Sequence, residues 1–169
     1  MTRGQLEHNI IFITRPNPLS CAKLDPGKNK RDKALFKKIH VVRIKPDQEL
    51  LEAIRRYCVE SGVSSAIIIG IIGSVRDAQL NYLKALPGKY ESIDYQGPLE
   101  IVCAQGSLAL KDKEPVLHIH IQLSSQGSCY GGHLAKATVF STAEVVIGEL
   151  DYQLWRQLDD YTGLNELVD

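Results

Sequence analysis

Hydrophobic and polar positions follow two different periods along this chain. Apolar residues between residues 47 and 61 recur at helical spacing, which predicts one amphipathic helix. Asp47 is its expected N-cap, and Gly62 stands where a C-terminal cap belongs. Most of the chain beyond this helix alternates or runs as short apolar segments between turn residues, which is typical of strands. The pattern therefore predicts an α+β fold: a mostly antiparallel β-sheet flanked by one or two helices.

Strands are expected at six places after residue 37. They cover residues 40–44, 65–72, 78–82, 99–103, 116–123 and, as one or two strands, 138–147. Turn residues separate them at Gly73-Ser74, Pro87-Gly88 and Gly97-Pro98. The last stretch, residues 150–158, is expected to form a second helix. Because no repeat or linker divides this part, residues 37–169 are expected to form one domain.

The first 36 residues differ from the rest and are expected to form an N-terminal extension, to which no role is assigned. Asn9–Thr14 could be a short strand, and prolines follow it. Six basic residues and one acid lie between Lys28 and Lys38. This stretch could bind phosphate or an acidic partner, or it could be a solvated loop. The charge balance favours the loop, because 20 Lys and Arg residues match 20 Asp and Glu residues.

Composition excludes several classes of protein. The zero net charge argues against a dedicated nucleic-acid clamp, although a local basic patch stays open. The longest apolar run, residues 66–72, is far shorter than the about 20 residues that a membrane span needs. Met1–His8 is too polar for a secretory signal. We therefore expect no membrane association and a cytoplasmic location.

The four cysteines are scattered, with no Cys-x-x-Cys pair. This spacing favours free thiols in a reducing compartment. Cys58 and Cys103 lie on expected apolar faces, so we expect both to be small buried groups.

The segment from residue 116 to 123 carries the most informative chemistry. A period of two places His118, His120 and Gln122 on one face of the expected strand and four apolar residues on the core face. His133 follows after Gly131-Gly132, whose small size allows close approach of the backbone. Three neutral imidazoles suit zinc, and also iron, nickel or copper. Three ligands with an open fourth position are typical of a catalytic zinc site. The alternative is that these histidines are merely exposed on a polar face.

Other candidate residues are less specific. Glu100 lies on the non-core face of its expected strand and could be a general acid/base or a fourth ligand, or simply an exposed carboxylate. Arg76 or Arg43 could hold an anionic substrate. His40 lacks a comparable context. No Gly-x-Ser-x-Gly elbow and no glycine-rich phosphate loop is present in the sequence.

Several segments taken together resemble the plants-and-prokaryotes-conserved (PPC) domain family. They are residues 69–74, 99–102, Gly106, His118-Ile-His120, Gly131-Gly-His-Leu134, 142–147 and 160–164. The resemblance implies a compact α+β fold that assembles as a homotrimer. In plants the domain follows an AT-hook, Arg-Gly-Arg-Pro, and those proteins bind A·T-rich DNA. This sequence has no such hook, so minor-groove binding by arginine is not expected from it.

The chain also resembles acetolactate decarboxylase, a zinc enzyme whose metal is held by a His-x-His and a later histidine. Carried onto this chain, that resemblance implies His118, His120 and His133 as metal ligands. Two functions follow as hypotheses. The first is a trimeric PPC-domain protein with a divalent metal, most simply zinc, and a DNA-binding or transcription-linked role, whose partners are itself and DNA or a regulatory protein. The second is a metal-dependent lyase or hydrolase that acts on a small carboxylated or ester substrate, an anionic ligand.

Overall fold

The computed structural model describes residues 36–168. The expected N-terminal extension therefore lies outside the described residues except for Phe36, and so does most of the basic stretch Lys28–Lys38. No helix in the described range is long and apolar enough to cross a membrane.

A single helix and seven strands make up residues 36–168, in the order β1 (Phe36–Ile44), α1 (Leu50–Glu60), β2 (Ala66–Ala85), β3 (Lys89–Lys111), β4 (Glu114–Ser124), β5 (Cys129–Leu150), β6 (Trp155–Leu158) and β7 (Asn165–Val168). The sheet order is β1-β5-β2-β3-β6-β7, and β4 pairs with β3 and β5. All pairs are antiparallel except β3–β6. A mostly antiparallel sheet with one helix confirms the predicted α+β fold.

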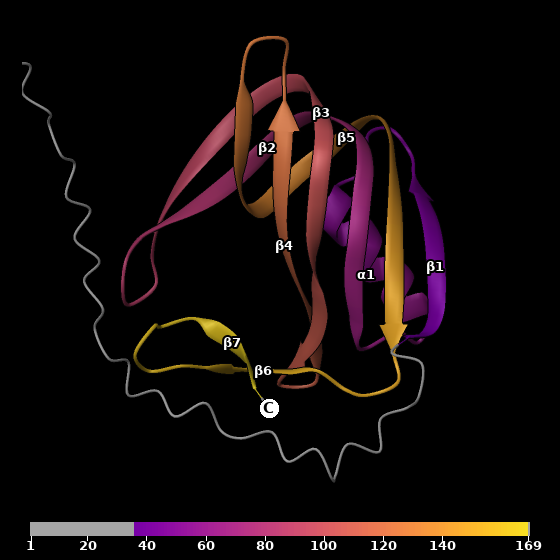
Figure 1. Ribbon diagram of the computed structural model, residues 1–169, viewed down its shortest axis with the longest axis vertical. Coiled ribbons are helices and arrows are strands. Elements are labelled where there is room, and N and C mark those ends of the chain that lie inside the picture. Colours follow the sequence, from indigo (N-terminus) through magenta and orange to yellow (C-terminus); the bar gives the residue numbers. More distant parts are fainter. Residues whose placement is uncertain (1–35, 169) are drawn as a thin grey trace, which may run out of the picture. The chain divides into compact units, whose positions relative to one another are not determined.

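Four strands pair in a closed circuit. β2 pairs with β3 and β5, and β4 joins the other edges of β3 and β5. The long strands β2, β3 and β5 contain register shifts, which bend a strand and increase its twist. Figure 1 shows these strands curving around β4, with α1 beside β1. The circuit holds the histidine-bearing strand β4 next to β5.

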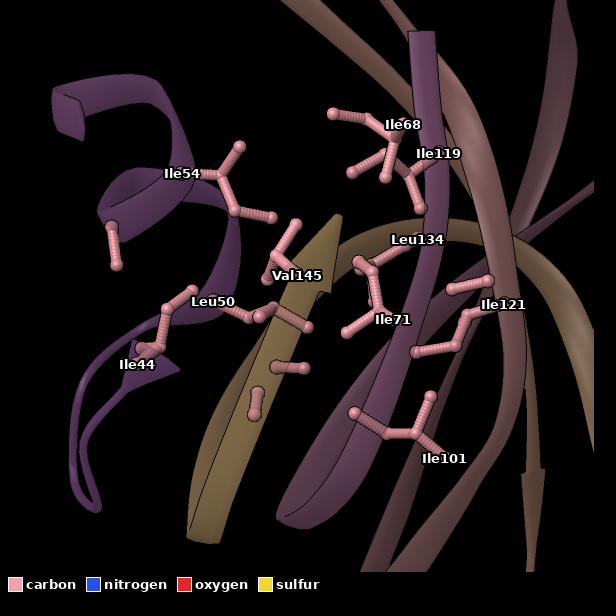
Figure 2. Packing of buried hydrophobic residues seen from close by; sticks show 14 of the residues in the cluster. Ile44, Leu50, Ile54, Ile68, Ile71, Ile101, Ile119, Ile121, Leu134 and Val145 are labelled. Atoms are coloured by element: carbon pink, nitrogen blue, oxygen red, sulfur yellow. The ribbon is translucent and has the colours of Figure 1, made fainter. Parts of the chain in front are cut away.

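The core lies between α1 and the concave face of the sheet (Figure 2). Leu50 and Ile54 of α1 are almost completely buried, and they pack with residues such as Ile68 and Val145 of the strands. Burying one such side chain stabilises a fold by roughly 1.5–3 kcal/mol. His40 of β1 is buried on this face, where its ring contacts the Tyr57 hydroxyl at 2.9 Å. The face of β1 that carries His40 therefore points toward α1.

The helix begins three residues later than the proposed cap. Glu49, not Asp47, is the N-cap, and its carboxylate accepts hydrogen bonds from the backbone N–H groups of Leu51 and Glu52. Asp47 has a left-handed backbone, φ 68°, and its side chain pairs with Arg76. The predicted C-terminal cap of the helix is confirmed, because Gly62 has φ 71° and donates its N–H to the Val59 carbonyl.

Two expected turns are absent. At both positions the strand continues, with a register shift in its pairing instead of a chain reversal. Gly73-Ser74 lies inside β2, where Gly73 has φ 138° and the register against β5 shifts. Gly97-Pro98 lies inside β3 beside another register shift, where proline needs no ladder hydrogen bond. Pro87-Gly88 does form the turn between β2 and β3.

Two further expectations were wrong. Residues 150–158 are not helical, because β5 runs to Leu150 and residues 155–158 form β6 against β7. Cys103 is exposed, because the register shift between Ile101 and Cys103 gives the buried position to Ala104. Cys58 is buried as predicted.

Candidate metal centre

The three histidines lie together because of strand register. His118 and His120 alternate along β4 with Ile119 and Ile121, whose side chains are buried in the core. His133 of β5 pairs directly with His120. The ring centroids of the three imidazoles are 4.9–5.5 Å apart. The pleat turns two histidines away from the core, and the β4–β5 pairing supplies the third.

Their nitrogen atoms can converge on one ion. One ring nitrogen from each histidine lies within 4.8 Å of the other two. Three imidazole nitrogens are a donor set that suits zinc and other first-row divalent cations. These residues therefore fit a metal ion, with further coordination positions left for other ligands.

Burial keeps two of the imidazoles in their metal-binding form. Burial, helped by the positive charge of Arg156, lowers the pKa of His118 to about 4. Burial also lowers the pKa of His133, with the nearby His120 adding to the effect. Both rings are therefore neutral near pH 7, the protonation state that a metal ion requires.

Arg156 is a site residue that the sequence did not reveal. Its guanidinium lies almost completely buried on β6 and donates to Ser107 Oγ and to the Asn165 carbonyl, each at 2.8 Å. A terminal nitrogen lies 3.3 Å from Nδ1 of His118. Nothing in the local sequence distinguishes Arg156 from a surface arginine, since only the docking of β6 onto β3 brings it here.

The histidines open into a cavity of about 830 Å³. β6 and β7 form one side of it, and Figure 1 shows this short hairpin across the end of the sheet where β3 meets β4. Gly88 ties it to the β2–β3 turn by donating its N–H to the Thr162 carbonyl at 2.8 Å. Besides the histidines and Arg156, the wall includes polar and apolar groups: Asn81, Tyr90, Gln105, Ser107, Val116, Leu117, Leu164, Asn165, Glu166 and Leu167. The cavity is large enough for a small organic molecule.

The structure does not bring the other candidates to this cavity. Glu100 pairs with Ser124, four residues beyond His120 on β4 and hence about 13 Å along the strand. Arg76 pairs with Asp47, and Arg43 donates to Thr142 Oγ1. Within residues 36–168, the one carboxylate that lines the cavity is that of Glu166.

The family of the chain follows from comparison with known proteins. The family model of the Plants and Prokaryotes Conserved (PCC) domain matches residues 31–151. The chain therefore belongs to this family, the one whose abbreviation is also written PPC. Arg156 and the β6–β7 hairpin lie beyond the matched residues.

Two solved structures share this fold over most of their length. The metal-containing protein AF0104 from Archaeoglobus fulgidus is 31% identical, with a TM-score of 0.73, and the match covers 79% of this chain and 95% of that one. A PPC protein from Pyrococcus horikoshii is 29% identical, with a TM-score of 0.74 and coverage of 79% and 93%.

A curated relative is much longer than this chain. The bifunctional protein GlmU from a Synechococcus strain is 29% identical over 133 residues, which is 77% of this chain and 20% of that protein. The chain therefore spans about a fifth of this relative. The resemblance to acetolactate decarboxylase is weak in structure: the Bacillus subtilis enzyme is 16% identical, with a TM-score of 0.46. That likeness is too distant to support an inference about the site.

Proposed function

We propose that this protein binds a divalent metal ion, most simply zinc, through His118, His120 and His133. The observation that carries the proposal is the convergence of three imidazole nitrogens, one per residue, within 4.8 Å at a cavity. The lowering of the pKa of His118 and of His133 by burial supports it, since no proton has to leave either ring near neutral pH. The similarity to a metal-containing archaeal protein at 31% identity supports it as well.

An open coordination position suits a site that binds a ligand or substrate better than a purely structural one. Structural zinc sites are closed by four protein ligands, whereas three protein ligands leave room for water or substrate. A zinc ion held here would polarise a bound carbonyl or carboxylate oxygen. The enzyme hypothesis places its reaction in this cavity, where Glu166 takes the place that the sequence suggested for Glu100 as acid or base.

Metal content per chain tests this proposal. The untagged wild-type protein, purified without chelator, is compared by elemental mass spectrometry with His118→Ala/His120→Ala and with Gln122→Ala. Gln122 is a matched control because it is an exposed polar residue of β4 outside the three-histidine cluster. We expect about one metal ion per chain in the wild type and in Gln122→Ala, and none in the double variant at unchanged circular dichroism. A wild type that takes up no metal from added zinc would contradict the proposal.

A DNA-linked role is the second candidate function. It derives from the family resemblance, and a protein of the same fold from Bacteroides thetaiotaomicron is described as a candidate DNA-binding protein at 24% identity, which supports the fold alone. The basic stretch Lys28–Lys38 would supply phosphate contacts, multiplied by assembly into a homotrimer. Duplex-DNA affinity measured at several salt concentrations tests it: a steep decline supports the role, and absent or salt-independent binding contradicts it.

A further inference from the structure

We propose that Arg156 is the anion-binding residue of the metal centre and that the ligand of the cavity is a small organic carboxylate. The inference rests on the proposed metal site and adds the chemical class of what binds there. Arg156 would hold the carboxylate next to the metal, and metal loading would make its guanidinium available.

The positive charge of Arg156 is not balanced by a paired carboxylate. Glu166, the one carboxylate that lines the cavity within residues 36–168, is exposed and accepts a hydrogen bond from Thr162 Oγ1. Arg156 is only 9% exposed. Its hydrogen-bond partners, a hydroxyl and a backbone carbonyl, are neutral, and Nε has no partner. None of the ion pairs within residues 36–168 includes it. A buried charge is costly unless it is paired, and a divalent metal would add positive charge beside it. An anion bound between them would offset part of this positive charge.

Metal binding and the contact between Arg156 and His118 exclude each other. A guanidinium only donates hydrogen bonds, so its 3.3 Å contact with Nδ1 needs the lone pair of that nitrogen. A neutral imidazole has only one such lone pair. If the metal binds Nδ1, it occupies the lone pair of that nitrogen. If the metal binds Nε2, the ring proton must be on Nδ1, which then has no lone pair to accept with. In both cases Arg156 loses this acceptor, and an N–H group is freed beside the metal.

The cavity favours a carboxylate over a phosphate. A guanidinium matches the planar carboxylate group with two parallel donors. Among the described residues that line the cavity there is no lysine and no second arginine, which a doubly charged phosphate would call for. Val116 and Leu164 line the same space and suit a short carbon chain.

The test uses the full chain loaded with Co²⁺, whose visible absorption changes with its ligands. Acetate, butyrate, butyramide and inorganic phosphate are titrated into the wild type, Arg156→Gln, Arg156→Lys and Arg55→Gln. Arg55 is a matched control because it lies on α1 and pairs with Glu52. We expect butyrate to bind more tightly than acetate or phosphate, and butyramide not to bind. Arg156→Gln should lower the affinity for butyrate at least tenfold, as expected for the loss of a charged hydrogen bond. The affinity should fall less in Arg156→Lys and not at all in Arg55→Gln.

Cobalt uptake separates this inference from the proposed function. Cobalt binding with butyrate affinity unchanged in Arg156→Gln would overturn the role of Arg156 and leave the metal site standing. Tighter binding of phosphate than of butyrate would overturn the assignment of a carboxylate as the ligand. Failure of the wild type to take up cobalt or zinc would overturn both proposals.

Calorimetry on the metal-free wild type provides a second readout. Butyrate should bind it at least tenfold more weakly than the loaded protein, and equal affinity would contradict the release of Arg156 by the metal. If Arg156→Gln does not fold, Ser107→Ala replaces it. That variant removes the hydroxyl that accepts from the guanidinium but keeps the charge, so butyrate should again bind more weakly, and unchanged affinity would contradict the inference.

Discussion

His118 shows how the packing of one residue prepares it for metal chemistry. Its strand neighbours Leu117 and Ile119 belong to the core side, so the imidazole must lie on the cavity side. There it is half-buried, beside the positive charge of Arg156 and two other imidazoles. Each of these surroundings disfavours a protonated ring, and the result is a neutral ligand at physiological pH.

The same burial makes the stability of the metal-free protein depend on pH. The folded pKa of His118 is about 4, below its ordinary value of 6.5. Between these values the unfolded chain binds more protons than the folded one, so the free energy of unfolding rises with pH in this window and falls as the pH is lowered through it. We expect the thermal midpoint of chelator-treated protein to fall between pH 6.5 and pH 4 more steeply for the wild type than for His118→Asn. Parallel pH curves would contradict this origin of the dependence.

At the scale of the elements, the sequence predicted those parts whose environment follows from local periodicity. The helix that ends just before Gly62 and the strand carrying His118 and His120 have strong periods of 3.6 and 2. The strand irregularities at Gly73 and Cys103 were missed, because a bulge is fixed by the neighbouring strand and not by local pattern. Arg156 was missed for the same reason: residues 150–158 are too few for periodicity to decide, and tertiary contacts with β3 decide instead.

Close pairing of β3 and β4 beside the histidines depends on Gly106. A Cβ atom at this position would lie 2.0 Å from the backbone oxygen of His118, so the strands would have to separate. We expect Gly106→Ala to lower the free energy of unfolding by about 1–3 kcal/mol, as overpacking usually does, and to weaken zinc binding. Chemical denaturation and a zinc titration measure the two effects. Gly70→Ala in β2 is the control, because its Cβ meets nothing within 4 Å; equal effects of the two substitutions would contradict the steric argument.

On the scale of the whole molecule, the outer face of the sheet lacks a cover within residues 36–168. His40 faces α1, so its neighbours Ile39 and Val41 face away from the helix, and they are 47% and 74% exposed. Register places Val41 beside Val146. In the adjacent row Ile72, which is 59% exposed, pairs with Glu144, and Glu144 pairs with Arg43. Exposed apolar residues with charged residues beside them are typical of an interface. We propose that copies of this chain cover it in the homotrimer implied by the family resemblance.

A charged residue on this surface should therefore dissociate the assembly. We expect light scattering coupled to size-exclusion chromatography to give three times the chain mass of 18.8 kDa for the wild type. Val41→Glu/Ile72→Glu should give the mass of one chain, because each subunit would bury two additional carboxylates in the interface. Val59→Glu is the matched control: Val59 is 54% exposed but lies on α1, which covers the opposite face. The Val59→Glu protein should keep the wild-type mass. A wild-type monomer would contradict the trimer, and a trimer that survives the double substitution would show that another surface mediates assembly.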